Sequence, residues 1–413
     1  MTEEKPSEEQ HNMEKDEAID FTKVKKNVTN FFTNPISENN KKLYDKHKKW
    51  VIPTLCILIA MSFSIFMRIQ PAYLPITDQW AESSIQNGIM NQAKAKINQQ
   101  YPNLPDQNKK PLIDAEYQTF YKQNKATIDQ QRAQLSQNLK AQMQDENGDT
   151  YLLAIDPYYW YGLARNKLRH GHYGDKINEN GDSVYTLRDG RVDKSVPKSI
   201  NPAAMYYLYR FMKVFDKDVT LFKAAFYVPL ILVTLAIIPI FFITRKVAGN
   251  VGGLFAGIFF AINGALLGRT PAGFSDTDPY NVFFPAFIGW MLLESLHTKD
   301  YKKSLLYISL AGLFTGLFAR AWTGWGFMFY FVLATLVLTF IYFLYIHRRS
   351  LKHSLNIFKI KEFKILISNG ITYLLASGVF VTLFVNYTSY TKVLFRPIRF
   401  MEIKNVAVNT VWP

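Results

Sequence analysis

The sequence predicts an all-α membrane protein, a polytopic bundle of transmembrane helices with a long, largely helical loop after the first helix. Apolar runs rich in Phe, Leu and Ile alternate with polar stretches rich in Lys, Asn and Gln. Several of these runs reach the roughly 20 residues that cross a bilayer. A polar region from about residue 68 to residue 217 separates the first apolar run from the others, and this predicts the long loop.

Composition excludes several other classes of protein. The apolar runs are too long for a soluble enzyme, a small disulfide-stapled module or a disordered chain. Cys56 is the only cysteine, so the chain forms no internal disulfide. The net charge of +15 does not by itself point to nucleic acid, because membrane proteins collect Lys and Arg in their cytoplasmic loops. We therefore expect membrane lipids, and no nucleic acid, among the partners.

The chain begins with a polar segment, 1–49, that changes from acidic to basic before the first apolar run. This pattern predicts a disordered cytoplasmic tail that ends in a basic, membrane-proximal collar. It is not typical of a cleavable signal peptide, because the apolar run begins late and no small-residue cleavage site follows it. The first transmembrane helix is predicted at 50–67, and Arg68 closes it.

A long external loop is predicted at 68–218, and its first half is rich in Gln, Lys and Asn. Within 81–148, apolar residues recur mostly every three or four positions, which is the period of an amphipathic helix. We expect an inserted helical hairpin that packs on the rest of the loop. A coiled coil that binds a partner is the alternative.

Transmembrane helices two to seven are predicted within 219–388, each bounded by charge or glycine. The spans are 221–244, 251–268, 280–296, 305–318, 326–346 and 365–386. With a cytoplasmic N-terminus, the basic connections at 244–246, 299–303 and 347–364 all lie inside, as the positive-inside rule requires. The sequence therefore predicts a multi-pass protein of the cell membrane, with 389–413 as the start of a later external segment that is truncated.

Two Asp-Pro-Tyr sequences lie on the predicted external side, at Asp156 and at Asp278. Asp before Pro commonly starts a helix, since the carboxylate caps free N–H groups and proline tolerates the first helical position. Capping alone is therefore one interpretation of each aspartate. The matching external placement of the two copies favours a second interpretation, a shared site.

The second copy lies in a turn that also carries Arg269 and Asp276. Charged groups are costly at a membrane, so their clustering in one short connection calls for a reason. Two carboxylates suit a hard divalent cation, and helix amino ends favour anions. We therefore expect a receptacle for a metal-bound phosphate or pyrophosphate. Its lipid side would admit a polyprenyl chain, and its aqueous side a protein or sugar acceptor.

Several motifs occur in the order found in a known family. Residues 155–166 read Ile-Asp-Pro-Tyr-Tyr-Trp-Tyr-Gly-Leu-Ala-Arg-Asn, and His-Gly-His-Tyr-Gly follows at 170–174. The segment 269–285 carries the arginine and the Asp-x-Asp pair. Ala-Trp-Thr-Gly-Trp-Gly stands at 321–326 and Asn-Thr-Val-Trp-Pro at 409–413. From residue 50 onward, apart from the Gln-rich insert, the chain resembles the catalytic subunit of oligosaccharyltransferases, most like the archaeal kind.

This resemblance implies a bundle like that of C-type glycosyltransferases. It also implies transfer of a glycan from a dolichol-linked phosphate or pyrophosphate to the side-chain amide of asparagine in Asn-x-Ser/Thr, without a covalent enzyme intermediate. The partners would be a lipid-linked oligosaccharide and an acceptor protein or peptide. Asp156, Asp276 and Asp278 would hold Mn²⁺ or Mg²⁺ and position the acceptor amide. Arg269 would lie beside the metal or the leaving phosphate.

The sequence lacks two features of that family, a later loop with a Thr-Ile-x-Glu-type glutamate and a domain with Trp-Trp-Asp. We therefore expect a fragment that is inactive alone. Three other functions stay open: a transferase that moves a monosaccharide from a lipid phosphate to a hydroxyl, a transporter, and a non-catalytic scaffold. A transporter would place ionisable groups near the bilayer midplane, whereas here the acids lie at the outer ends of spans.

Overall fold

The computed structural model describes residues 38–187, 194–348 and 361–397, with side chains from residue 50 onward. The chain divides into two compact units, 1–55 and 56–413. The described part of the first unit is the beginning of helix α3, Glu38–Arg68. Residues 38–49 are thus helical where we predicted a disordered tail. No glycine or proline interrupts the chain between Glu38 and Pro53, and this favours a continuous helix.

Five described helices are long and apolar enough to cross a membrane: Trp50–Arg68 within α3, α10 (Leu221–Ile262), α13 (Tyr301–Ala321), Thr323–Ile346 including α14, and α16 (Lys361–Phe384). The predicted polytopic helical fold is confirmed. Helix α10 covers the predicted span 221–244 and most of the span 251–268, which are separated by a break in the helix at Gly249, where φ is 67°. Helix α12 (Tyr280–His297) corresponds to another predicted span, although it is not among these five.

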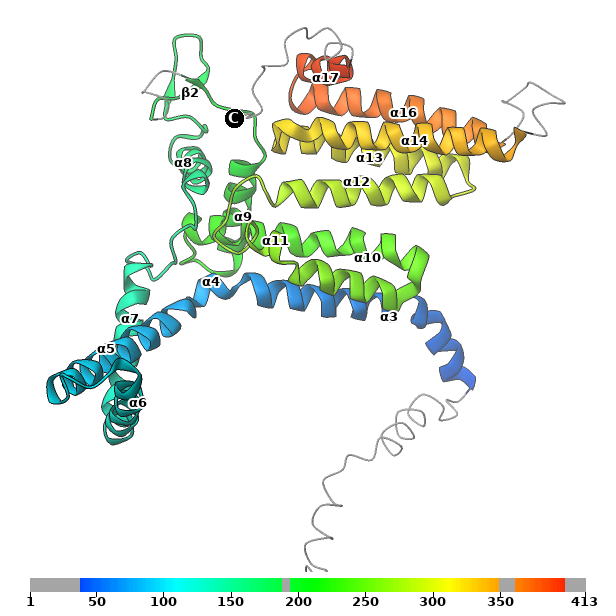
Figure 1. The fold of residues 1–413 in the computed structure, drawn as a ribbon. Helices are drawn as coiled ribbons and strands as arrows, with labels where there is room; N and C mark the ends of the chain where they lie inside the picture. The colour runs from blue at the N-terminus through cyan, green and yellow to red at the C-terminus, as the bar shows by residue number, and fades with distance from the viewer. Residues whose placement is uncertain (1–37, 188–193, 349–360, 398–413) are drawn as a thin grey trace, which may run out of the picture. The chain divides into compact units, whose positions relative to one another are not determined.

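The later helices pack side by side, with α12 between α10 and α13, and α13 against α16 (Figure 1). Small residues allow the closest approach. A Cβ on Gly312 would lie 2.7 Å from the side chain of Ala376, and one on Gly316 would lie 2.5 Å from that of Phe380. Small residues bring helices close in this way inside membranes. Helix α14 (Gly326–Ile346) and the shorter elements η1 (Thr323–Trp325) and α17 (Tyr387–Leu394) complete this part.

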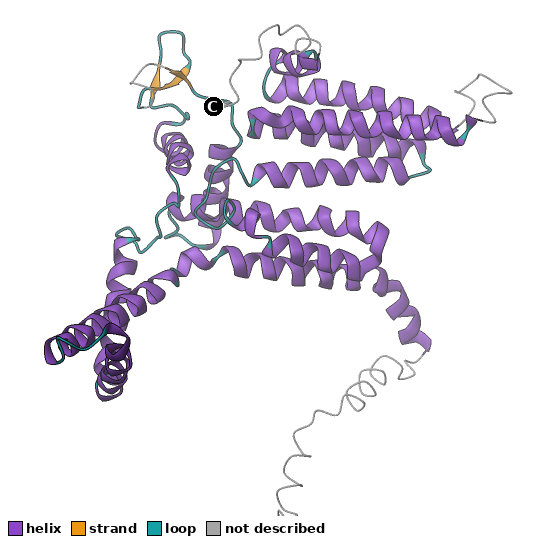
Figure 2. Cartoon of the chain, viewed as in Figure 1, coloured by secondary structure: helices purple, strands orange, loops and turns teal. Residues whose placement is uncertain are grey.

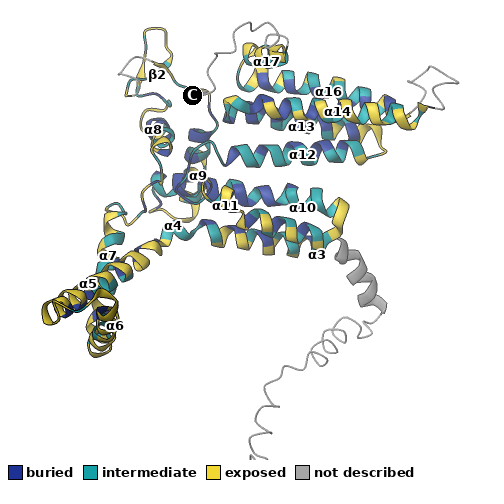
Figure 3. Ribbon diagram, viewed as in Figure 1, coloured by how far each residue is buried: buried dark blue, intermediate teal, exposed yellow. Residues whose placement is uncertain are grey.

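The Gln-rich insert forms three helices rather than the predicted hairpin. After α4 (Gln70–Tyr73), α5 (Ile76–Gln100) packs against both α6 (Asp106–Gln123) and α7 (Lys125–Gln142). Ser136 on α7 donates a 2.5 Å hydrogen bond to Asp78 on α5. Most of the surface of these three helices is exposed (Figure 3).

The second half of the first loop leads back to the bundle (Figure 2). Helix α8 (Ile155–His170) is followed by short antiparallel strands in the order β1 (Lys176–Ile177), β2 (Ser183–Tyr185) and β3 (Lys194–Ser195), and then by α9 (Asn201–Phe215). In this sheet Val184 of β2 pairs with Lys176 and with Ser195. Helix α9 packs on α8 and on α10, and Met205 and Tyr209 belong to the buried cluster there. These contacts place α8 beside the start of α10.

Candidate functional site

Helix α8 carries the first candidate residue, Asp156, in its first turn. The backbone N–H of Leu153, just before the helix, donates a 3.0 Å hydrogen bond to the carbonyl of Gly273. Gly273 belongs to the second loop, the segment between α11 (Gly264–Leu267) and α12. The start of α8 is therefore fixed directly to the loop that carries the other candidate residues.

Two transmembrane helices accept backbone hydrogen bonds from the middle of this second loop. Ala272 donates a 2.8 Å backbone hydrogen bond to the carbonyl of Arg68 at the end of α3, and Gly273 donates one of 2.7 Å to Phe226 on α10. Gly273 has a φ of 92°, a conformation that side chains rarely adopt. A Cβ there would also lie 2.7 Å from the ring of Phe226, so the position requires glycine for two reasons.

A buried polar network holds the stretch on either side of Asp276. Ser275 donates its hydroxyl proton to the carbonyl of Ala225. The amide of Asn201, at the start of α9, donates to the Ser275 carbonyl at 3.2 Å, and its oxygen accepts from the Tyr280 hydroxyl at 3.2 Å. Ser275, Asn201 and Tyr280 are all at most 1% exposed. Asp276 therefore projects from a segment whose two flanks are fixed.

The charged side chains gather at this segment. Trp160, one turn after Asp156 on α8, donates its indole N–H to Asp276 Oδ1 at 3.0 Å. Arg269 Nη1 lies 3.9 Å from Asp278 Oδ2. Burial raises the pKa of Asp278, and the neighbouring charges of Asp276 and Asp156 raise it further, against the opposing effect of Arg269. The electrostatic influence of Asp156 on Asp278 means that all four predicted site residues share one neighbourhood.

The donor chemistry of this neighbourhood fits a hard divalent cation. Burial and the neighbouring carboxylates of Asp276 and Asp156 raise the pKa of Asp278, and such an ion stabilises carboxylates that lie close together. One helical turn beyond Asp278, the buried Asn281 Oδ1 has no hydrogen-bond partner among the described residues. In the described part of the chain, however, no three His, Cys, Asp or Glu side chains are already arranged to hold one ion.

Sequence reasoning missed three residues that build the site. Trp160 could have been found, because residues four apart share one helix face and Asp156 was already a candidate. Arg68 was noted only as the end of a span, yet its side chain is fully buried and donates to Thr270 at 3.1 Å and to the Ala261 carbonyl at 2.8 Å. Asn201 gave no sequence signal.

This arrangement defines a class: multi-pass helical membrane proteins with an acidic site formed by two loops at one end of the bundle. A family model described as "Oligosaccharyl transferase STT3, N-terminal" matches residues 130–412, which is more than half of the chain. The chain belongs to this family, and the family predicted from the motifs is confirmed.

Individual relatives are also similar. A dolichyl-phosphooligosaccharide-protein glycotransferase of Methanococcus voltae is 30% identical over 285 residues, covering 65% of this chain and 31% of the relative. One of Methanocaldococcus jannaschii is 38% identical over 192 residues, covering 43% and 20%. A solved oligosaccharyltransferase of Archaeoglobus fulgidus aligns with a TM-score of 0.41 and 16% identity, covering 61% of this chain and 33% of that one. The chain thus spans about a third or less of the length of these relatives.

Proposed function

We propose that this chain forms the carrier- and metal-binding part of an oligosaccharyltransferase. Its substrate would be a glycan on a dolichol-linked phosphate or pyrophosphate, and the acceptor the side-chain amide of asparagine in an Asn-x-Ser/Thr sequence. The observation that carries the proposal is the convergence of Asp156, Asp276, Asp278 and Arg269 from two loops in a chain that belongs to this family.

The residues of the site would have distinct roles. Asp156, Asp276 and Asp278 would hold Mn²⁺ or Mg²⁺, which when bound supplies a Lewis acid toward the departing phosphate. A carboxylate oxygen would accept a hydrogen bond from the acceptor amide, which loosens amide conjugation and raises the nucleophilicity of the nitrogen. Arg269, 69% exposed at its side chain, can leave Asp278 and bind the leaving phosphate. No residue is required to form a covalent bond to the sugar.

The placement of the site supports interfacial chemistry rather than transport. Asp276 and Asp278 stand before the first residue of α12, and Asp156 stands in a loop helix outside the predicted spans. A dolichol chain could therefore lie beside the helices while its phosphate reaches the acids. With a cytoplasmic N-terminus, this end of the bundle faces the outside of the cell.

Metal binding by the chain and glycan transfer in membranes test the proposal separately. Mn²⁺ bound to the purified 413-residue chain is measured by electron paramagnetic resonance, for the wild type and for Asp276→Asn. The same substitution is placed in the gene in its own cells, and their membranes receive lipid-linked oligosaccharide and an Asn-x-Thr peptide. We expect Asp276→Asn to abolish both Mn²⁺ binding and glycopeptide formation.

Asp300→Asn is the matched control, because it removes a carboxylate that caps α13 at the opposite end of α12. It should leave glycopeptide formation and Mn²⁺ binding at the wild-type level. Undiminished glycopeptide formation by Asp276→Asn would remove this aspartate from the active site.

A further inference from the structure

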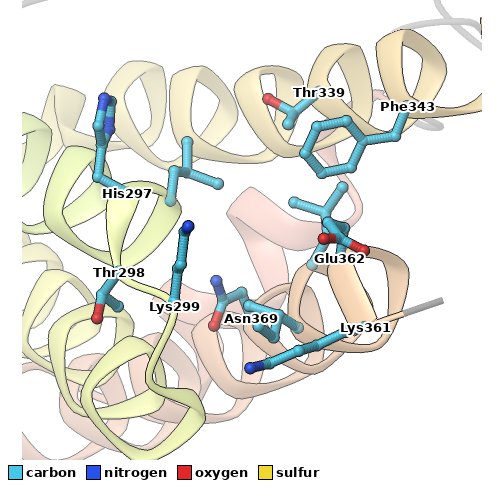
Figure 4. A pocket seen from close by; sticks show the side chains of 11 residues that line it. His297, Thr298, Lys299, Thr339, Phe343, Lys361, Glu362 and Asn369 are labelled. Carbon is cyan, nitrogen blue, oxygen red and sulfur yellow. The ribbon is translucent and has the colours of Figure 1, made fainter. Parts of the chain in front are cut away.

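The other end of the bundle contains a cavity that the proposed reaction does not use. It has a volume of about 340 Å³ and lies where the end of α12, the middle and end of α14 and the start of α16 meet (Figure 4). Its inner wall is apolar and includes Leu296, Phe343 and Leu366. Its rim is polar and carries Lys299 and Lys361. A wall and rim of this kind fit an amphiphile with one polar end.

The cavity is a built feature of the bundle. Beside it, the buried ring of Phe363 on α16 contacts Phe340 at 5.4 Å and Phe343 at 6.1 Å between ring centroids, both on α14. On its inner side, Asn369 is fully buried and exchanges hydrogen bonds with Ser304 of α13, at 2.9 and 3.0 Å. The helices around the cavity are thus fixed to one another by the aromatic contacts of Phe363 and by the hydrogen bonds of Asn369.

The charge at this end of the bundle is strongly positive. The described residues of the two connections here, 297–303, 347–348 and 361–364, contain six Lys or Arg and two acidic residues. One of these acids, Asp300, is occupied as the cap of α13. Among the described residues, Lys299 and Lys361 have no ion-pair partner, and Glu362 is the one acidic residue that lines the cavity. The cavity is therefore complementary to an anion.

The cavity and the acidic site lie at opposite ends of α12. The acidic loop precedes Tyr280, the first residue of this helix, and the cavity is lined by His297, its last. Eighteen helical residues span about 27 Å, close to the thickness of the hydrocarbon core. The cavity thus lies at the opposite interface, where the basic connections predict the cytoplasmic leaflet.

We propose that this cavity binds the head group of an anionic phospholipid of that leaflet. The lipid phosphate would lie between the ammonium groups of Lys299 and Lys361, and the start of its chains would follow the apolar wall at Leu296 and Phe343. The outer face of α14 beside it carries exposed apolar side chains, such as Ile341 and Ile346, which suits continuous contact with lipid chains. Basic pockets between transmembrane helices on this side of a membrane bind lipid head groups in the same way.

Native mass spectrometry of the purified 413-residue chain tests the proposal. The chain is titrated in detergent with phosphatidylglycerol or with uncharged phosphatidylcholine, and the fraction that carries one lipid is measured. We expect a single phosphatidylglycerol to remain bound and phosphatidylcholine to bind far more weakly. Lys299→Gln and Lys361→Gln should each weaken binding about fivefold, and the double variant about thirtyfold.

Two further variants distinguish binding of the lipid in the cavity from general electrostatic attraction to the basic end of the bundle. Glu362→Gln should strengthen binding, because it removes the one acidic lining residue. Lys302→Gln removes an exposed charge at the same end of the bundle but outside the lining, and should leave binding unchanged. An equal loss from Lys302→Gln, no loss from the double variant, or displacement of the lipid by millimolar inorganic phosphate would each overturn the proposal.

Discussion

At the scale of single residues, helix α8 contributes twice to the acidic site. Asp156 and Trp160 lie one turn apart on it, so one helix carries a proposed metal ligand and the donor that orients another. The indole N–H can only donate, and its hydrogen bond occupies Oδ1 of Asp276. We infer that Trp160 leaves the second oxygen of Asp276 for the cation.

Trp160→Phe should therefore weaken metal binding while preserving the fold. Phenylalanine keeps an aromatic ring near Tyr159, whose ring centroid lies 4.9 Å from that of Trp160, but it cannot hold Asp276. Loss of such a supporting hydrogen bond typically weakens metal affinity by about 10- to 100-fold. Mn²⁺ titration of the purified chain measures this change.

Trp290→Phe provides the matched control. In the wild type, the indole N–H of Trp290 also donates to a carboxylate, that of Glu294, at 3.0 Å. This hydrogen bond lies near the other end of α12. Mn²⁺ affinity should stay at the wild-type value in this variant. Equal Mn²⁺ affinities for wild type and Trp160→Phe would show that the Trp160 hydrogen bond does not orient Asp276 for the ion.

Asp278 should make the metal-free chain less stable at neutral pH than at mildly acidic pH. Its pKa in the folded chain is raised above the ordinary 3.8 by burial and by Asp276, so the folded state holds this proton more tightly than the unfolded state. Its contribution to stability therefore falls as pH rises from about 4 through the raised pKa, and it stays unfavourable above that.

Asp278→Asn removes this contribution, so the metal-free variant should melt above the wild type at pH 7. The difference should shrink as the pH is lowered toward 4. Thermal unfolding without divalent ions, measured between pH 4.5 and pH 8, checks both statements. A variant that melts below the wild type at pH 7 would contradict the unfavourable charge at Asp278.

At the scale of elements, the second loop acquires its shape from contacts with three other segments. Leu153, Phe226 and Arg68 all bond to the backbone of Ala272 or Gly273. The conformation of the loop therefore depends on tertiary contacts more than its sequence suggests. The consequence is that a change at Gly273 should act on α8 and on the acids together.

Gly273→Ala should both destabilise the chain and weaken Mn²⁺ binding. The methyl group would meet Phe226 at 2.7 Å and Leu153 at 3.1 Å, in a backbone conformation that costs alanine free energy as well. Strain of this kind typically costs about 1–3 kcal/mol. Thermal unfolding and Mn²⁺ titration of the same preparations measure the two effects.

Gly148→Ala separates the backbone cost from the clash. Gly148 also has a positive φ, 77°, but a Cβ there meets nothing within 4 Å. It should lower the melting temperature less than Gly273→Ala and leave Mn²⁺ affinity unchanged. Identical effects of the two variants would mean that the contacts of Gly273 do not position the acids.

The elements themselves were predictable to different degrees. Hydropathy and length predicted the apolar helices, because a bilayer-spanning helix needs a long apolar run. The insert was predicted as helical but not as three helices, although Pro102 and Pro105 marked the break between α5 and α6. The network through Arg68, Asn201 and Ser275 was not predictable, because its partners in other segments lie 50 residues apart or more and only packing brings them together.

At the scale of the whole chain, both proposals depend on the orientation of α12 in the membrane. The acidic loop lies at the start of this helix and the basic cavity at its end. If α12 crosses the membrane, the two sites must face opposite sides. The proposed glycan-transfer site then faces the outside only if the basic connections are cytoplasmic.

Membrane-impermeant maleimide labelling of intact cells tests this orientation. In a Cys56→Ala background, Glu179→Cys places a thiol in the exposed turn between β1 and β2, and Lys302→Cys places one in the first turn of α13. We expect Glu179→Cys to be labelled in intact cells and Lys302→Cys only after permeabilisation, because the three basic connections favour the cytoplasmic side. The reverse pattern would place the acids in the cytoplasm, beside the wrong leaflet for the proposed reaction. It would also move the basic cavity away from the cytoplasmic leaflet, where anionic lipids concentrate.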